Sequence, residues 1–237
     1  MLGKHIATFL SIIIMNVVVL LAASPSVLTI NEVFTHNEKG NFGGLPSDMI
    51  SGTGMNGNPN EQYAPPTSWS WPTSDPSTWT TNGTNRYWDE WQSNRILDSV
   101  SSVNNKIGFA IFDLGEIFNL EIFYIWNERE NSNRYTKTFS VYLSSSPTVL
   151  PTHGPTNSTT VDYDFSSGGT GWTLINSGGE LTGTHQGNQT IDLSSHQGRY
   201  IAVEILTNNG DPNRVGLAEV GVTGSPLTSK GTFFLIE

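Results

Sequence analysis

The 237-residue chain contains no cysteine, which excludes disulfide bonds, thiol nucleophiles and metal sites built on thiolates. A fold of this length can bury enough apolar surface to be stable without such crosslinks. The five histidines show no H-E-x-x-H or comparable spacing, and neither a G-x-S-x-G turn nor a phosphate-binding glycine loop occurs. Acidic pairs at 89–90 and 128–130 are interpreted as solvated loop charges, so we expect no enzyme activity.

Basic residues are also scarce, with 11 lysines and arginines against 21 aspartates and glutamates, and the formal net charge is −10. A surface with this excess of negative charge repels phosphate backbones and anionic lipid headgroups. Nucleic acid is therefore not an expected partner.

Residues 1–24 begin with a short basic segment around Lys4, continue with an uncharged apolar run and end on small residues. This order is typical of a secretory signal peptide. The apolar run is also long enough to serve as an uncleaved membrane anchor, which is the one membrane contact we expect. Both interpretations place the rest of the chain outside the cell, either secreted or at the cell surface.

Residues 107–127 form the longest apolar run outside the N-terminus. The run divides at Gly115 into two pieces, 108–114 and 120–126, which have the length of strands and no polar face. We therefore expect two strands that are buried on both sides, with Gly115 allowing the chain to reverse between them. Asp113 is expected to accept backbone N–H groups of that turn. A helix is the alternative, which the glycines and the β-branched and aromatic residues disfavour.

Further strands are indicated by alternating apolar and polar residues. They are predicted at 27–34, 135–143, 161–165, 172–175, 189–193, 200–206 and 216–222. The segments 135–143 and 200–206 alternate most regularly, which predicts half-buried strands. Residues 93–103 are interpreted either as a helix or as a short strand and turn. Many short strands without a long amphipathic helix predict an all-β sandwich or barrel, with one domain at 25–224 and a short tail at 225–237.

Residues 36–94 are rich in Gly, Pro, Ser, Thr and Asn and show little periodicity. A stretch of this length is either disordered or forms elaborate loops. The five tryptophans between 69 and 91 favour ordered loops, because disordered segments are poor in aromatic residues.

Four segments occur in an order that resembles the discoidin or coagulation-factor type C family, part of the galactose-binding-like group that includes carbohydrate-binding modules. They are IGFAIFDLG (107–115), LEIFYIWNERENSNRYTKTFSVYLSSSP (120–147), GRYIAVEI (198–205) and GLAEVGVTG (216–224). The resemblance covers residues 95–224 well and 25–94 only loosely. It implies a jelly-roll β-sandwich whose ligand site lies at one end, where loops 127–134 and 207–214 meet part of 69–91.

Those loops carry aromatic side chains, which stack on the apolar face of a sugar ring, and planar polar groups, which hydrogen-bond its hydroxyls. The candidate ligand-binding residues are Trp69, Trp71, Trp88, Trp91, Arg129, Asn131, Arg134 and Asn209, with Trp79, Arg86, Glu130, Asn208 and Arg214 in the same loops. The alternative for any one tryptophan is a packing role. The alternative for Arg134 is an ion pair with a carboxylate such as Asp113 or Glu219.

The resemblance also implies a structural Ca²⁺ ion near the first loops. Glu219 matches the family's glutamate in the closing strand, and Ser51 and Asn56 are candidate oxygen ligands together with Asp48. The family's early aspartate falls near Ser51, so one charged ligand is missing. The alternative is that Glu219 is an ordinary strand carboxylate.

Together these features predict a secreted, non-catalytic recognition domain that binds carbohydrate or a glycosylated cell-surface ligand. The alternative is a structural or adhesive extracellular protein in which the tryptophans only anchor loops. The sequence does not indicate an oligomeric state.

Overall fold

The computed structural model describes residues 25–38, 45–50, 55–56, 80–81, 91–93, 95–127, 133–155, 159–166, 171–181 and 189–227, with 55–56, 80–81 and Gln92 described by backbone alone. The predicted signal peptide or anchor at 1–24 lies outside these residues. No helix formed by the described residues is long and apolar enough to cross a membrane.

The described chain is all-β, as predicted. Its strands are β1 (Ser26–Val27), β2 (Glu32–Thr35), β3 (Met55–Asn56), β4 (Thr80–Thr81), β5 (Trp91–Gln92), β6 (Gly108–Asn127), β7 (Thr136–Ser144), β8 (Thr173–Glu180), β9 (Gln189–Asp192), β10 (Gln197–Asn208) and β11 (Gly216–Pro226). Two short 3-10 helices, η1 (Pro46–Ile50) and η3 (Val103–Asn105), are the helical elements among the described residues.

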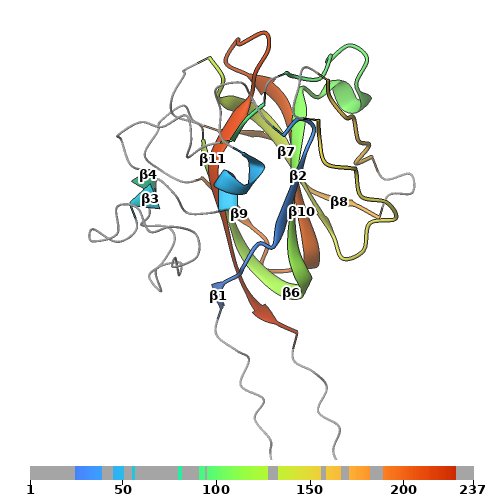
Figure 1. Cartoon of the computed structure of the whole chain (residues 1–237). Helices are drawn as coiled ribbons and strands as arrows, with labels where there is room; N and C mark the ends of the chain where they lie inside the picture. Colours follow the sequence, from blue (N-terminus) through green and yellow to red (C-terminus); the bar gives the residue numbers. More distant parts are fainter. Residues whose placement is uncertain are drawn as a thin grey trace, which may run out of the picture.

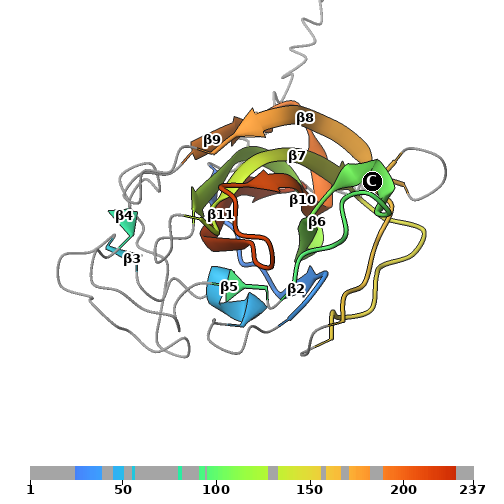
Figure 2. The ribbon, with the colours of Figure 1, turned by 90° about the horizontal axis from the view of Figure 1, so that it is seen from above.

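Nine strands form one antiparallel sheet in the order β1-β11-β6-β10-β7-β8, with β2 and β9 also paired to β6 and β5 paired to β11. The first half of β6 pairs with β2 and β10, whereas its second half pairs with β9 and β11. One strand therefore contributes to two layers, and the sheet wraps around its own core (Figures 1 and 2). The strands β3 and β4 form a separate pair.

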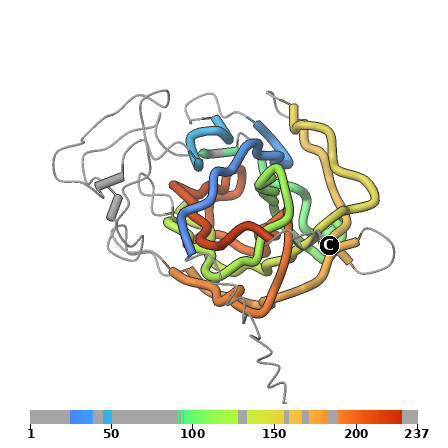
Figure 3. Tube along the Cα trace, turned by 90° about the horizontal axis from the view of Figure 1, so that it is seen from below, coloured from blue at the N-terminus to red at the C-terminus, as the bar shows by residue number. Residues whose placement is uncertain are grey.

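The two layers depend on a sharp bend in β6. An extended strand would place residues 112 and 123 about 36 Å apart, at roughly 3.3 Å per residue. The ring centroids of Phe112 and Phe123 are instead 5.9 Å apart, so the two halves of β6 face each other across the core. The bend lies at the lower end of the molecule in Figure 1, and Figure 3 looks onto this end.

The prediction of two separate strands divided at Gly115 is therefore wrong. Gly115 does have the left-handed backbone that was expected of it, with φ of +85°. The strand nevertheless continues through an irregularity in the ladder: the register with β10 shifts between the pairs Asp113–Tyr200 and Phe118–Gly198, and Asn119 is then paired with Gln197 of β10 and with Ser225 of β11.

Asp113 fixes the start of the bend. Its Oδ1 accepts the Gly115 N–H at 2.7 Å, which is the turn contact predicted for it. Arg199 of β10, which the sequence did not indicate, donates through Nε to Oδ1 at 2.7 Å and through Nη2 to Oδ2 at 2.8 Å. Burial raises the pKa of Asp113, but the hydrogen bonds from Arg199 and Gly115 outweigh burial and hold that pKa below its usual value.

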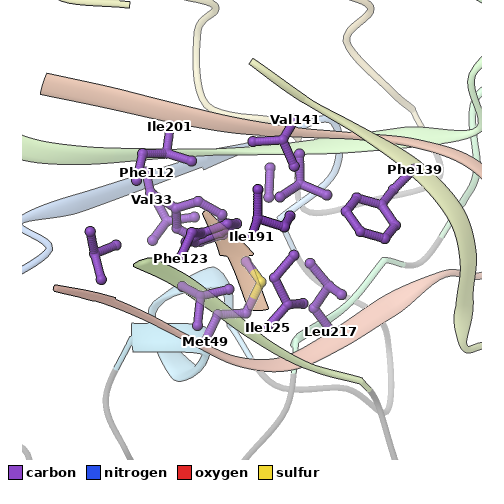
Figure 4. Packing of buried hydrophobic residues seen from close by; sticks show 14 of the residues in the cluster. Val33, Met49, Phe112, Phe123, Ile125, Phe139, Val141, Ile191, Ile201 and Leu217 are labelled. Atoms are coloured by element: carbon purple, nitrogen blue, oxygen red, sulfur yellow. The ribbon is translucent and has the colours of Figure 1, made fainter. Parts of the chain in front are cut away.

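The main core fills the space between the two layers. Figure 4 shows its side chains converging from both sides. Those that it labels are Val33, Met49, Phe112, Phe123, Ile125, Phe139, Val141, Ile191, Ile201 and Leu217. Met49 of η1 is fully buried, so this short helix closes one side of the core.

A second core covers the outer face of β7 and β10. Tyr142, Tyr200 and Ala202 pack there against Phe165 and Trp172, and the rings of Tyr142 and Phe165 stack with centroids 5.2 Å apart. The prediction that 135–143 and 200–206 are half-buried strands is therefore wrong, because Tyr163, Phe165 and Trp172 cover their second face. A strand was also predicted at 161–165, and none forms.

The other predicted strands are found with shifted ends. Residues 172–175, 189–193 and 216–222 correspond to β8, β9 and β11. Residues 27–34 give two short strands, β1 and β2, with an irregular connection at 28–31. In place of a single helix or strand, the described residues of 93–103 form turns that lead into η3.

His36 is a buried polar residue that directly follows β2 and contacts the start of β6. Its Nδ1 accepts the Phe109 N–H at 3.2 Å, and its Nε2 donates to the Arg95 carbonyl at 3.0 Å. Burial lowers the pKa of His36 to about 4 and outweighs the carbonyl hydrogen bonds, which raise it. The neutral imidazole is therefore the form that the fold accommodates.

We expect Gly115→Ala to destabilise the fold more than Gly178→Ala. Both glycines have positive φ, which costs an alanine about 1–2 kcal/mol. At Gly115 the new Cβ would also displace Nδ2 of Asn31 from its hydrogen bond with the Leu114 carbonyl, whereas nothing lies within 4 Å of one at Gly178. Urea unfolding measures the difference, with Gly198→Ala as the near-neutral control. Equal losses at both positions would contradict a specific requirement at the bend.

We also expect unfolding stability to fall as the pH drops from 6.5 to 4. In this window the unfolded state takes up a proton at His36 that the folded state does not bind, because the folded pKa is lowered from 6.5 to about 4. At about 1.4 kcal/mol per pKa unit, the loss approaches about 3 kcal/mol. His36→Gln should be less stable at neutral pH but lose less over this window. Parallel pH profiles for both proteins would overturn the assignment.

Candidate functional site

Three segments that are distant in the sequence meet at the end opposite the bend. The Asp211 N–H donates to the Asn133 carbonyl at 3.0 Å, and the Ile96 N–H donates to the Asn213 carbonyl at 2.8 Å. We call residues 95–96, 133–135 and 208–215 the loop-end surface; Figure 2 looks down on this end. The described parts of loops 127–134 and 207–214 therefore converge, as the sequence predicted.

The loop between β10 and β11 is held by its own side chains. Nδ2 of Asn208 donates to the carbonyls of Asp211 and Arg214, both at 2.7 Å. Oδ1 of Asp211 accepts the N–H groups of Asn213 at 2.8 Å and Arg214 at 2.9 Å. These bonds order the turn internally, and an ordered turn lowers the entropy cost of binding at any surface that it forms.

Arg134 links this turn to the neighbouring segment. Its Nε lies 3.2 Å from Oδ2 of Asp211, and the two side chains are only 14% and 16% exposed. An ion pair was predicted as the alternative role of Arg134, with Asp113 or Glu219 as its partner. The described contact is with Asp211 instead, and Asp113 is bound by Arg199 at the other end of the fold.

Trp91 was predicted to bind ligand, and this prediction is wrong. The side chain is fully buried, its indole N–H donates to the Asn37 carbonyl at 3.1 Å, and its ring meets His36 edge-on at 5.5 Å. The reason is the pairing of β5 with β11, where Trp91 lies opposite Leu217 and joins the main core.

The other predicted ligand-binding residues have different outcomes. Asn209 is exposed on the loop-end surface, as expected of a binding residue. Five lie outside the described residues and stay predictions: Trp69, Trp71, Trp88, Arg129 and Asn131.

The predicted calcium ligands are only partly described. Glu219 is 1% exposed on β11, and η1, which contains Asp48, packs against that strand. A buried carboxylate beside a loop is an oxygen donor of the type that Ca²⁺ takes. Ser51 lies outside the described residues, and Asn56 is described by its backbone alone. Calcium at Glu219, Ser51 and Asn56 therefore stays a prediction.

Sequence reasoning missed Asp211 as the residue that organises the loop-end surface. A signal was present, because Asn-Gly-Asp-Pro-Asn at 209–213 is a strong turn sequence in which an aspartate accepts backbone N–H groups. Within the described ranges, no three His, Asp or Glu side chains gather closely enough to hold a metal ion.

No protein-family model matches the sequence, and no curated protein matches it. The chain is similar to several solved structures. CpGH89CBM32-5 from Clostridium perfringens, in complex with GalNAc-β-1,3-galactose, has 12% sequence identity and a TM-score of 0.46, with 83% of this chain and 99% of that chain covered. The family 32 carbohydrate-binding module of NanJ from C. perfringens, in complex with galactose, has 11% identity and a TM-score of 0.44, with 84% and 98% covered.

A fucolectin from striped bass (Morone saxatilis) serum has 12% identity and a TM-score of 0.47, with 84% of this chain and 49% of that chain covered. These three structures are carbohydrate-binding modules or lectins, the discoidin-like group that the four sequence segments resemble. Identities and scores this low assign neither a ligand nor a family to this chain.

We expect Asp211→Ala to loosen the loop-end surface, whereas Asp211→Asn should largely preserve it. Alanine removes the acceptor for the N–H groups of Asn213 and Arg214, but the asparagine oxygen can still accept both. Amide hydrogen exchange at residues 213 and 214 measures this directly. Exchange should be clearly faster in the alanine variant than in the asparagine variant. Equally fast exchange in both would mean that the ion pair with Arg134, and not the turn, holds the loop.

Proposed function

We propose that the chain is a secreted, non-catalytic carbohydrate-binding domain that holds its ligand on the loop-end surface. The observation that carries the proposal is the convergence of the three segments on a turn that is already ordered. Asn133, Asn209 and Asn213 are exposed there. Their planar amides offer both donors and acceptors, which is the pattern that neighbouring sugar hydroxyls require.

The arginines of this surface fit the same ligand class. Arg134 and Arg214 are partly exposed beside the amides, and their planar guanidinium groups add donors in a fixed geometry. Because Arg134 is paired with Asp211, its charge is balanced, which suits a neutral sugar better than a phosphate or sulfate. The ordered turn supports weak but specific binding through few contacts.

The remaining parts of the proposal rest on the sequence. Trp69, Trp71 and Trp88 supply the stacking faces, and Arg129 and Asn131 extend the polar contacts of the same loops. Ca²⁺ at Glu219 stabilises the first loops. The N-terminal segment exports the chain or anchors it, so that the ligand is a free or cell-surface glycan.

A structural or adhesive role without a small ligand is the second candidate. The burial of Trp91 favours it, because that tryptophan anchors a loop to the core and contributes nothing to the surface. If the other tryptophans act in the same way, the loop-end surface has no aromatic platform.

A glycan array probed with the purified protein, with and without added calcium, distinguishes the two candidates. We expect binding to at least one class of glycan, and the double variant Asn209→Ala/Asn213→Ala should weaken it at least about tenfold, roughly 1.4 kcal/mol. Thr29→Ala, an exposed change beside the bend, is the matched control and should bind normally. A stable protein that binds no glycan under either condition supports the structural role.

A further inference from the structure

A pocket of about 390 Å³ opens on the outer face of β7 and β10. We call it the outer-face pocket. Its lining includes Asn104, Tyr142, Trp172, Leu174 and Glu204. A volume of this size suits a small organic molecule.

Glu204 is the unusual member of this lining. It lies in β10, is only 1% exposed, and belongs to a strand face that otherwise carries apolar residues. Its Oε1 accepts from Nδ2 of Asn104 at 3.2 Å, and its Oε2 accepts from the Tyr142 hydroxyl at 2.9 Å. Burial, followed by the charge of Glu204, raises the pKa of Tyr142, so this hydroxyl keeps its proton and donates.

Both donors to Glu204 are neutral. The part of the chain that the structure describes places no lysine, arginine or histidine within ion-pairing distance of it, whereas Lys106, Arg134 and Arg199 are each paired with other carboxylates. Each carboxylate oxygen can accept two hydrogen bonds, so one acceptor position remains on each. A buried carboxylate without a cation is costly, and a cationic ligand would relieve that cost.

The walls and the rim of the pocket suit an organic cation. Tyr142 and Trp172 bring aromatic rings to the pocket, and aromatic faces attract ammonium groups. Asn104 is exposed and holds a left-handed backbone conformation, with φ of 62°, which places its amide on Glu204. Because Asn104 belongs to the exposed turn η3, a ligand can reach the carboxylate by displacing one amide.

We propose that the outer-face pocket binds a small organic ammonium ion, such as a primary amine on a sugar-sized or short alkyl body. The ammonium group donates to the two oxygens of Glu204 and lies against the ring of Tyr142, and the body of the ligand contacts Trp172 and Leu174. This site shares no residue with the loop-end surface, so it does not depend on the proposed function.

The test is titration of the protein with glucosamine and butylamine, with N-acetylglucosamine as the neutral comparison, followed by NMR shifts of residues 142, 174 and 204. We expect saturable binding of at least one amine, weakened by salt, and no comparable binding of the neutral sugar. Glucosamine alone would identify an amino-sugar site, and butylamine a site for simple amines. Binding of the neutral sugar as tight as that of the amines, or no saturable binding of either amine, overturns the proposal.

Two variants and a control separate the charge of Glu204 from the fold. Glu204→Gln keeps the shape and should weaken amine binding at least about tenfold. Leu174→Lys, at a position 49% exposed on the rim, introduces a tethered ammonium that should block the site without changing the core. Glu180→Gln removes one exposed charge from the same strand, β8, and should bind normally. Normal binding by both Glu204→Gln and Leu174→Lys would also overturn the proposal.

Discussion

The bend in β6 is the constraint on which the two-layer architecture depends. A single strand provides the centre of both layers, so Phe112 and Phe123 meet across the core only because the strand turns back between them. The turn is stabilised by a small polar cluster in which Asp113 accepts from Gly115 and from Arg199. A contact of a few polar atoms thus determines where the apolar residues of the two layers are placed.

The molecule uses polar groups that are partly or fully buried in two different ways. At the loop-end surface, Asn208 and Asp211 bond to backbone groups of their own turn and leave other side chains to face solvent. On the outer face, Glu204 accepts hydrogen bonds from the neutral side chains of Asn104 and Tyr142 and lines a pocket. The first arrangement orders a turn, and the second places an acidic side chain beside aromatic rings, so the two proposed sites differ in their chemistry.

The sequence was sufficient to predict most of the strands, and insufficient to predict what covers them. Alternation identified β7 and β10, but it did not show that Tyr163, Phe165 and Trp172 pack against their second face. Convergence of the loops was predictable from the resemblance in segment order. The burial of Trp91 was not, because it depends on pairing with β11, a strand far along the chain. The ion pair of Arg134 was not predictable either. Its partner Asp211 lies in a segment whose sequence identifies a turn but does not show which residues the turn contacts.

The pairing of β1 with β11 brings Ser26 opposite Gly224, so the first and last strands of the fold lie side by side. Both leave the sheet at the end of the bend, at the bottom of Figure 1, and the loop-end surface lies at the other pole. A tether, a surface or a second domain joined to either strand would therefore be attached at the end opposite the loop-end surface. The loop-end surface would then point away from the attachment point and stay accessible to solvent, whichever of the two strands is attached.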